Sequence, residues 1–503
     1  MKLGKLAEKL VREEKKSGGK SGSKSSTLSF GLLYQLSYMS VVAAAGVPRA
    51  LIFEHSAQLP CATAEYFRRI ELNCRKLKYD YAKACQLVGE SAKEEEIKAL
   101  LLRFSSSLSS GEPEADFLAR EAEAQAEAYD NEYGRKLETL KMWTDAYVSL
   151  ILSAVLVIIM GIVSTMVWKV ETAFIVGLAV AAIGTTLLGV WLIYLMAPRE
   201  ITVLHQAGSR EQKLVRKLFK LLAPLALVVC GLFALRGANL GWALMMAAAL
   251  IFPVGFISSV DNKKVIKRDA EVGVFLRSLG GVCAAIGTTV RDAVGRIDLH
   301  SINTLRREVR NLHTRLASGI RAQLCWQRFV EETGSELANR SVGMFCDAVE
   351  LGGEPGRAGY RALLFASKIA MLRARRKTVS SPFRWLCIAM HGAVTMLLVF
   401  ITEVIGIFGA LVAKAEQSMP TVSGSGSMGA LTSFNFSGLE LMHSLVVPLV
   451  LIFTVANAVA PSIADGGSNY KILHNLAITA AISGASLVFL PTLASMLFKS
   501  VQM

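Results

Sequence analysis

Long apolar stretches constrain this chain more than any other feature of its sequence. A helix that crosses the hydrocarbon core of a bilayer needs about 20 predominantly apolar residues, and seven stretches approach or exceed that length. Pro224 interrupts the third stretch, which is the shortest, and Pro253 interrupts the fourth. We therefore predict an all-α, polytopic membrane protein with about seven transmembrane helices. The seven candidate spans are 147–168, 173–197, 219–235, 239–259, 385–411, 439–460 and 474–497.

The composition agrees with a membrane protein. Hydrophobic residues make up 52% of the chain and charged residues 19%, whereas an average soluble protein has about 25% charged residues. These values exclude a wholly soluble enzyme and a chain that is disordered over most of its length. A net charge of +15 would suggest nucleic-acid binding in a soluble protein. In a membrane protein it is typical of the positive-inside rule, so we expect no nucleic-acid partner.

The distribution of positive charge predicts the orientation. With the N-terminus inside and all seven spans threaded, 51 of the 55 Lys and Arg residues lie on the inner side. Only Lys169, Arg236, Lys414 and Lys499 then lie outside. We therefore predict a multi-pass protein of the cell membrane with a cytosolic N-terminus and an outside C-terminus. Treating the third and fourth spans as one re-entrant unit would keep this orientation, and a miscounted pair would give five to nine spans.

Two long segments between the spans are predicted to be cytosolic helical bundles. In the first, apolar residues recur every three or four positions from Leu118 to Leu140, which is typical of one helix face. The apolar stretch 28–53 is broken near Pro48, so we expect a buried core helix there. The predicted parts are a disordered basic tail (1–27), helical domain 1 (28–146), membrane block 1 (147–259, with a cytosolic loop at 198–218), helical domain 2 (260–384) and membrane block 2 (385–503, with an outside loop at 412–438).

The two cytosolic segments repeat one another. Four anchors recur at an offset of 241 or 242 residues, and each segment then enters a membrane span. This pattern predicts a duplicated helical domain. The matched anchors are Ala43-Ala44-Ala45-Gly46 with Ala284-Ala285-Ile286-Gly287, Arg49 with Arg291, Ser110-Gly111-Glu112-Pro113 with Gly352-Gly353-Glu354-Pro355, and Trp143 with Trp385.

The Gly-Glu-Pro element in each copy predicts a turn between two antiparallel helices. A glycine in the left-handed conformation ends a helix, and proline is favoured in the first turn of the next. We expect the turns at Gly111, Glu112 and Pro113 and at Gly353, Glu354 and Pro355.

These motifs resemble the type II secretion F-domain family, the inner-membrane platform proteins of type IV filament and type II secretion machines. The residues that carry the resemblance are VAAAGVPRAL (42–51) and FSSSLSSGEPEADFLAREAEA (104–124), with VCAAIGTTVRDAV (282–294) and MFCDAVELGGEPGRAGYRALL (344–364) in the second copy. The resemblance covers roughly half of the chain. The number of spans makes the archaeal branch the nearest match, the platform of the archaellum or of an archaeal pilus, and a fusion of two tight-adherence pilus platform proteins is also similar.

The resemblance implies a homodimeric membrane platform. A hexameric cytosolic secretion or assembly ATPase would dock below it, and prepilin or archaellin-like subunits would pass through or beside it into a filament. Two basic clusters are candidates for partner binding, either to an acidic ATPase surface or to anionic membrane lipids. They are Arg306, Arg307 and Arg310, and Arg373, Arg375, Arg376 and Lys377.

Glu403 lies inside the fifth predicted span, where a carboxylate is costly and is a functional hypothesis by default. It could bind a partner helix or a filament subunit, or it could be a structural group near the membrane interface. It is also the basis of an alternative function, in which the chain is a secondary transporter and Glu403 is its coupling carboxylate.

No catalytic constellation is visible in the sequence. The Walker-like string ending at Gly19-Lys20-Ser21 lacks its first glycine and a preceding strand. The eight cysteines have neither zinc-site spacing nor a companion histidine cluster. We therefore expect no enzyme, no cofactor and no metal.

Overall fold

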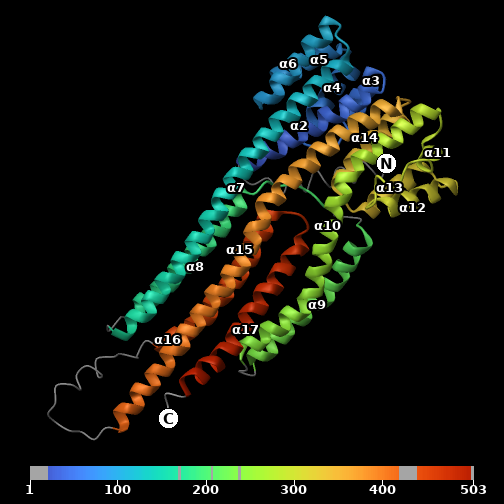
Figure 1. Cartoon of the computed structure of the whole chain (residues 1–503). Coiled ribbons are helices and arrows are strands. Elements are labelled where there is room, and N and C mark those ends of the chain that lie inside the picture. The colour runs from blue at the N-terminus through green and yellow to red at the C-terminus, as the bar shows by residue number, and fades with distance from the viewer. Residues whose placement is uncertain (1–20, 168–171, 205–207, 236–238, 419–438, 500–503) are drawn as a thin grey trace. The chain divides into compact units, whose positions relative to one another are not determined.

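The computed structural model describes residues 21–167, 172–204, 208–235, 239–418 and 439–499. Within these ranges the fold is all-α, as predicted, with one isolated antiparallel bridge between Val203 and Ser335. The first part of the predicted tail, 1–20, lies outside the described residues, and a helix already begins at Ser21. The helices are α2 (Ser21–Ala44), α3 (Arg49–Ser56), α4 (Ala64–Leu77), α5 (Tyr81–Glu90), α6 (Glu95–Ser110), α7 (Glu114–Val167), α8 (Thr172–Met196), α9 (Arg210–Leu235), α10 (Leu240–Ile286), α11 (Val290–Val294), α12 (Arg306–Ala317), α13 (Ala322–Thr333), α14 (Glu336–Glu350), α15 (Pro355–Ser418), α16 (Leu439–Asp465), the short 3-10 helix η2 (Asn469–Lys471) and α17 (Ile472–Lys499) (Figure 1).

The chain divides into two compact units, each assembled from three separate segments. Unit 1 contains 1–135, 198–210 and 263–375, and unit 2 contains the remaining segments 136–197, 211–262 and 376–503. The division falls inside α7, α10 and α15, so each of these continuous helices belongs to both units. Most of both predicted cytosolic domains lies in unit 1, and the predicted membrane spans lie in unit 2.

Aromatic residues form the core of the first copy in unit 1. The ring of Phe53 on α3 stacks on Phe104 of α6 and on Tyr81 of α5, with ring centroids 5.4 and 4.7 Å apart. Phe104 in turn stacks on Phe117 of α7 at 5.0 Å. Each of these helices therefore contributes a large apolar side chain to one cluster, which fixes how they pack.

The two segments predicted to be copies of one another are interleaved in unit 1 rather than independent. Helix α2, from the first copy, packs against α14 of the second. The Tyr38 hydroxyl donates a hydrogen bond of 2.9 Å to Asp347, and the Arg340 guanidinium lies over the Tyr34 ring at 4.7 Å. Helix α2 is a buried core helix of the kind predicted for 28–53, because almost every residue from Ser29 to Val42 is buried.

The first Gly-Glu-Pro turn connects α6 to α7. Gly111 ends α6 in the left-handed conformation (φ 75°), and its N–H donates to the Ser107 carbonyl. Glu112 pairs with Arg120 and accepts a 2.7 Å hydrogen bond from the Ser107 hydroxyl, and both contacts lower the pKa of its carboxyl. Pro113 immediately precedes the first residue of α7.

The second turn connects α14 to α15 and is shifted by one residue. Here Gly352 has the left-handed conformation (φ 83°), and Pro355 is the first residue of α15. Gly353 meets a different requirement, since a Cβ there would lie 2.4 Å from the Ala45 Cβ. The neighbouring Glu354 N–H donates to the Ala45 carbonyl at 2.9 Å. The second turn therefore rests on the backbone of the first copy.

Unit 2 consists of long apolar helices. Six helices in the described part of the chain are long and apolar enough to cross a membrane, against about seven predicted. The remaining candidate lies in α9, whose first half carries Arg210, Lys213, Arg216, Lys217 and Lys220, so its charge-free stretch is short. Leucines nevertheless cover the outer side of that stretch, as at Leu227, which is 75% exposed. A seventh span in α9 and the orientation of the termini remain predictions.

Helix α15 runs through a proline without ending. Pro382 favours a break before the fifth predicted span, yet it lies inside the 64-residue helix. A proline inside a helix costs about 3 kcal/mol, and packing offsets this cost. The next residue, Phe383, is buried edge-on against Tyr147 of α7, with ring centroids 5.9 Å apart.

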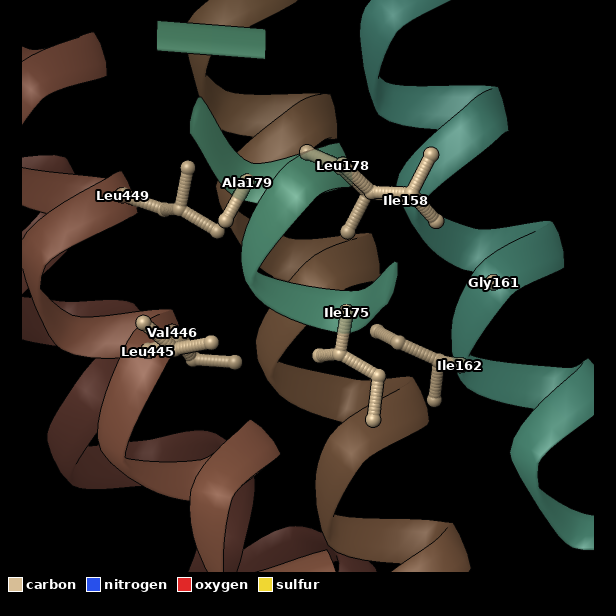
Figure 2. A pocket seen from close by; sticks show the side chains of 9 residues that line it. All are labelled: Ile158, Gly161, Ile162, Ile175, Leu178, Ala179, Leu445, Val446 and Leu449. Atoms are coloured by element: carbon tan, nitrogen blue, oxygen red, sulfur yellow. The ribbon is translucent and has the colours of Figure 1, made fainter. Parts of the chain in front are cut away.

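The C-terminal part of α7 and the N-terminal parts of α8 and α16 pack closely around a small apolar pocket of about 20 Å³ (Figure 2). Figure 2 shows Ile162 of α7 pointing toward Ile175 of α8, with leucine and valine side chains of α16 across the pocket. Gly161 permits this approach, because a Cβ there would lie 2.5 Å from a methyl group of Leu178. The pocket has room for no more than a water-sized group.

Candidate functional site: buried charges, a polar chain and an arginine surface

Arg373 of α15 is the centre of a buried charge network in unit 1. Its guanidinium donates to Asp269 of α10 at 2.6 Å and to Glu200 at 3.1 Å. All three side chains are at most 10% exposed. Asp269 also accepts a hydrogen bond from the Ser335 hydroxyl. One guanidinium therefore balances the negative charge of two buried carboxylates.

This network holds the segment that joins α8 to α9. Arg373 also donates to the Ile201 carbonyl at 3.3 Å. The Glu336 N–H donates to the Thr202 carbonyl at 3.2 Å, and the Leu204 N–H donates to the Gly334 carbonyl at 3.2 Å. The short loop is therefore bound by side-chain and backbone hydrogen bonds to the second copy.

A second buried ion pair positions α12. Arg268 of α10 pairs with Glu308 of α12 at 2.6 Å, and both side chains are at most 7% exposed. Arg268 also donates to the Thr333 carbonyl at 3.1 Å. Because Glu308 is the acidic residue of α12, this pairing turns its negative charge inward.

The outer side of α12 is consequently basic. Arg306, Arg307 and Arg310 are all exposed, and within the part of the chain that the structure describes no ion pair or hydrogen bond is recorded for their guanidinium groups. We call these three side chains the α12 arginine surface. Its geometry suits an acidic partner surface or anionic headgroups, because arginine binds carboxylates and phosphates through two parallel hydrogen bonds.

The other predicted basic cluster does not form one surface. Arg373 and Arg376 are buried, so neither presents its guanidinium to a partner in this structure. Arg375 is exposed and lies 3.4 Å from Asp130 of α7, and Lys377 is half-buried. Their spacing in the sequence suggests a shared role, but successive residues of a helix point in different directions.

Arg376 caps the end of α16 in unit 2. Its guanidinium donates to the carbonyls of Ile463 and Ala464 at 2.9 Å each, which are orphan acceptors at a helix C-terminus. Gly466 follows in the left-handed conformation (φ 68°), and a Cβ there would lie 2.7 Å from the guanidinium carbon. The turn from α16 to α17 therefore requires both the arginine and the glycine.

A chain of hydrogen bonds crosses the apolar interior of unit 2. His391 of α15 is fully buried, and one ring nitrogen lies 2.8 Å from the Ser483 hydroxyl of α17 while the other lies 3.2 Å from the Asn457 amide of α16. Asn457 also accepts a 3.0 Å hydrogen bond from the Tyr147 hydroxyl of α7. The Thr454 hydroxyl continues the chain, 2.7 Å from Ser483. Four helices are thus joined by polar contacts, as expected for His and Asn inside membrane helices.

Glu403 lies on α15 and is half-buried. It is twelve residues beyond His391, or about 18 Å along the helix at 1.5 Å per residue. It is therefore not part of the polar chain around His391.

Several residues of these networks were not singled out in the sequence, among them Asp269, Glu200 and Gly466. Asp269 and Glu200 lie in charged stretches that resemble ordinary solvated surfaces. Gly466 belongs to a Gly-Gly pair, a turn signal that could have placed the turn. Within the described part of the chain, no group of three or more His, Cys, Asp or Glu side chains could hold a metal ion.

Comparison with known proteins gives two similar relatives. Flagella accessory protein J of Methanocaldococcus jannaschii is 24% identical over 412 residues, which are 79% of this chain and 72% of that protein. Flagella accessory protein J of Methanococcus voltae is 24% identical over 353 residues, which are 67% of this chain and 62% of that protein, so the chain spans less than two thirds of the second relative. No family model matches the chain. No solved structure matches it.

Proposed function

We propose that this chain is the membrane platform of an archaellum-type filament machine. The observation that carries the proposal is its similarity, over most of its length, to two proteins named flagella accessory protein J. The fold supports it, since an all-α chain with six helices suited to a membrane and a large helical unit is what a platform requires. Membership of the wider type II secretion F-domain family is part of the same proposal.

Long continuous helices would couple the cytosolic part of the platform to the membrane. Helix α7 has 54 residues and α15 has 64, which correspond to about 80 and 95 Å at 1.5 Å per residue. Each passes from unit 1 into unit 2 without a break. A displacement of unit 1 would therefore be carried into the membrane through the helix backbone.

In this proposal the α12 arginine surface docks a cytosolic assembly ATPase. The surface carries three positive charges that the rest of the described chain leaves available, and an acidic ATPase surface would complement them. The platform would act as a homodimer in contact with membrane lipids, and archaellin-like subunits would be its cargo.

A binding assay with the full-length protein in detergent tests the docking proposal. The variant Arg306→Glu, Arg307→Glu, Arg310→Glu should weaken binding of the assembly ATPase from the same cell at least tenfold. The matched control is Lys76→Glu, Lys78→Glu, Lys93→Glu, which makes the same charge change at exposed lysines of the first copy. An equal loss in both triple variants would contradict docking at α12, and no ATPase binding by the wild-type protein would contradict the platform role.

The transporter alternative makes a different prediction. If the chain were a transporter with Glu403 as its coupling carboxylate, Glu403→Gln would abolish transport, and the assembly ATPase would not bind the wild-type protein. For a platform we expect cells with Glu403→Gln to assemble filaments, because Glu403 lies outside the described networks that hold the helices together. Loss of filaments in this variant, with the protein present at normal levels in the membrane, would show that the Glu403 carboxylate has a functional role.

A further inference from the structure

Unit 2 contains an apolar groove of about 240 Å³ between α9, α10 and α17. Small side chains are part of its lining, notably Ala223 and Ala226 on α9 and Ala247 on α10, and Leu473 of α17 also lines it. Every residue that lines the groove is apolar or cysteine. The groove therefore suits a hydrocarbon ligand rather than a polar one.

Helices α10 and α17 touch one another, and the groove lies between them and α9. A Cβ on Gly255 would lie 2.3 Å from the His474 backbone nitrogen, and one on Gly241 would lie 2.9 Å from the Gly484 carbonyl oxygen. Helices α10 and α17 are thus in backbone contact at two levels and form a continuous wall.

Helix α9 contacts its neighbours on both sides of the groove. Toward its charged end, the Gln212 amide donates to Asp261 of α10 at 3.0 Å, and Phe219 packs edge-on against Tyr470 of η2 with ring centroids 5.2 Å apart. Eleven residues later the Cys230 sulfur lies 3.8 Å from the Ala243 carbonyl. Pro224 lies midway between the Phe219 and Cys230 contacts, and a proline inside a helix favours a bend. The groove is the space between these two contacts.

Its length matches one leaflet of a bilayer. The stretch from Phe219 to Cys230 rises about 16 Å at 1.5 Å per residue, and half of the hydrocarbon core is about 15 Å. A helix about 10 Å wide would occupy over 1,000 Å³ across the same length, so a filament subunit does not fit. A single hydrocarbon chain does.

Positive charge flanks the groove at the level of Phe219. Lys220 of α9 is exposed beside the groove, and no ion pair or hydrogen bond is recorded for its ammonium group within the described residues. Lys217 is also exposed, but at about 100° per residue it lies on the face of α9 opposite Phe219, Ala226 and Cys230. Aromatic rings and lysines at one level are typical of the membrane–water interface. We propose that the groove binds one hydrocarbon chain of an anionic membrane lipid, whose phosphate pairs with Lys220.

Filling the groove tests the hydrocarbon part of this proposal. Ala226→Phe places a ring in the groove, whereas Val228→Phe places the same ring on α9 at a residue that is 57% exposed and does not line the groove. Native mass spectrometry of the full-length protein in mild detergent should find one retained anionic lipid per chain in the wild type and in Val228→Phe. Retention should fall at least tenfold in Ala226→Phe. Equal retention in all three proteins would overturn the proposal.

Adding lipid to delipidated protein tests the proposed ionic contact between the lipid phosphate and lysine. This test does not require a core variant to fold. Phosphatidylglycerol in detergent micelles should raise the midpoint of thermal unfolding, and phosphatidylcholine should raise it less. The surface variant Lys220→Gln should remove that difference, whereas Lys217→Gln, on the opposite face of α9, should keep it. Inorganic phosphate alone should have no effect. Equal stabilisation of the wild type by both lipids, or by phosphate alone, would also overturn the proposal.

Discussion

Removing the Arg373 guanidinium should release the loop between α8 and α9. Arg373→Ala leaves Asp269 and Glu200 buried without their cation, and removing one partner of a buried ion pair costs about 3–5 kcal/mol. It also removes the hydrogen bond to the Ile201 carbonyl. Arg375→Ala is the matched control, because the exposed pair with Asp130 at 3.4 Å is worth about 0–1 kcal/mol.

Limited proteolysis of the full-length protein measures this difference. The loop ends in two trypsin sites, after Arg199 and Arg210. Where cleavage follows the open population, a change of about 3 kcal/mol raises the cleavage rate on the order of 100-fold. We expect an increase of that order in Arg373→Ala and less than about fivefold in Arg375→Ala.

A rescue variant separates lost charge pairing from lost packing. Arg373→Met combined with Asp269→Asn and Glu200→Gln replaces the buried charges with neutral groups of similar size, which is often neutral for stability. Cleavage in this variant should return close to the wild-type rate. The reasoning is refuted if Arg373→Ala is cleaved no faster than Arg375→Ala.

Three further predictions concern other contacts. Burial raises the pKa of the Asp347 carboxyl, so its contribution to stability falls as pH rises above about 3.9, the ordinary pKa of an aspartate. Asp347→Asn should flatten this part of the stability–pH curve and raise the midpoint of thermal unfolding at pH 7. An unchanged curve would contradict this prediction. In a thermal unfolding assay, Gly466→Ala should destabilise the protein by more than about 1 kcal/mol, because φ is positive there and the Arg376 side chain occupies the place of a Cβ. The control Gly406→Ala, on a helix with open space beside it, should be neutral or stabilising in the same assay. Asn457→Leu should cost about 1–2 kcal/mol in unfolding by denaturing detergent, because two membrane hydrogen bonds are lost; no change would show that the polar chain contributes little.

Local patterns in the sequence predicted much of this fold. The apolar stripe from Leu118 to Leu140 and the first span form the single helix α7, because one helical register continues through both. The Gly-Glu-Pro elements predicted where α7 and α15 begin, since glycine and proline act on their own backbone. Each of these signals is contained within a few residues of the structure it determines.

Features that depend on distant residues could not be predicted in this way. Arg373 and Arg375 are two positions apart in one basic run, yet only Arg373 meets Asp269, which precedes it by 104 residues. Pro382 would end an isolated helix, and tertiary packing of its neighbours keeps α15 continuous. In each case a tertiary contact outweighed the local signal.

The interleaving of unit 1 has a consequence for how the chain is made. Helix α2 and the loop at Ile201 find their partners on α14 and α15, and the last segment of unit 1 ends about 240 residues after the first. At a synthesis rate of about 5–20 residues per second, the first segment waits about 12–48 s for the last to be translated. In the meantime the hydrophobic helices between them leave the ribosome. The apolar face of α2 stays uncovered during this interval, so nascent chains that stall before α14 should be a main target of chaperones and quality-control proteases.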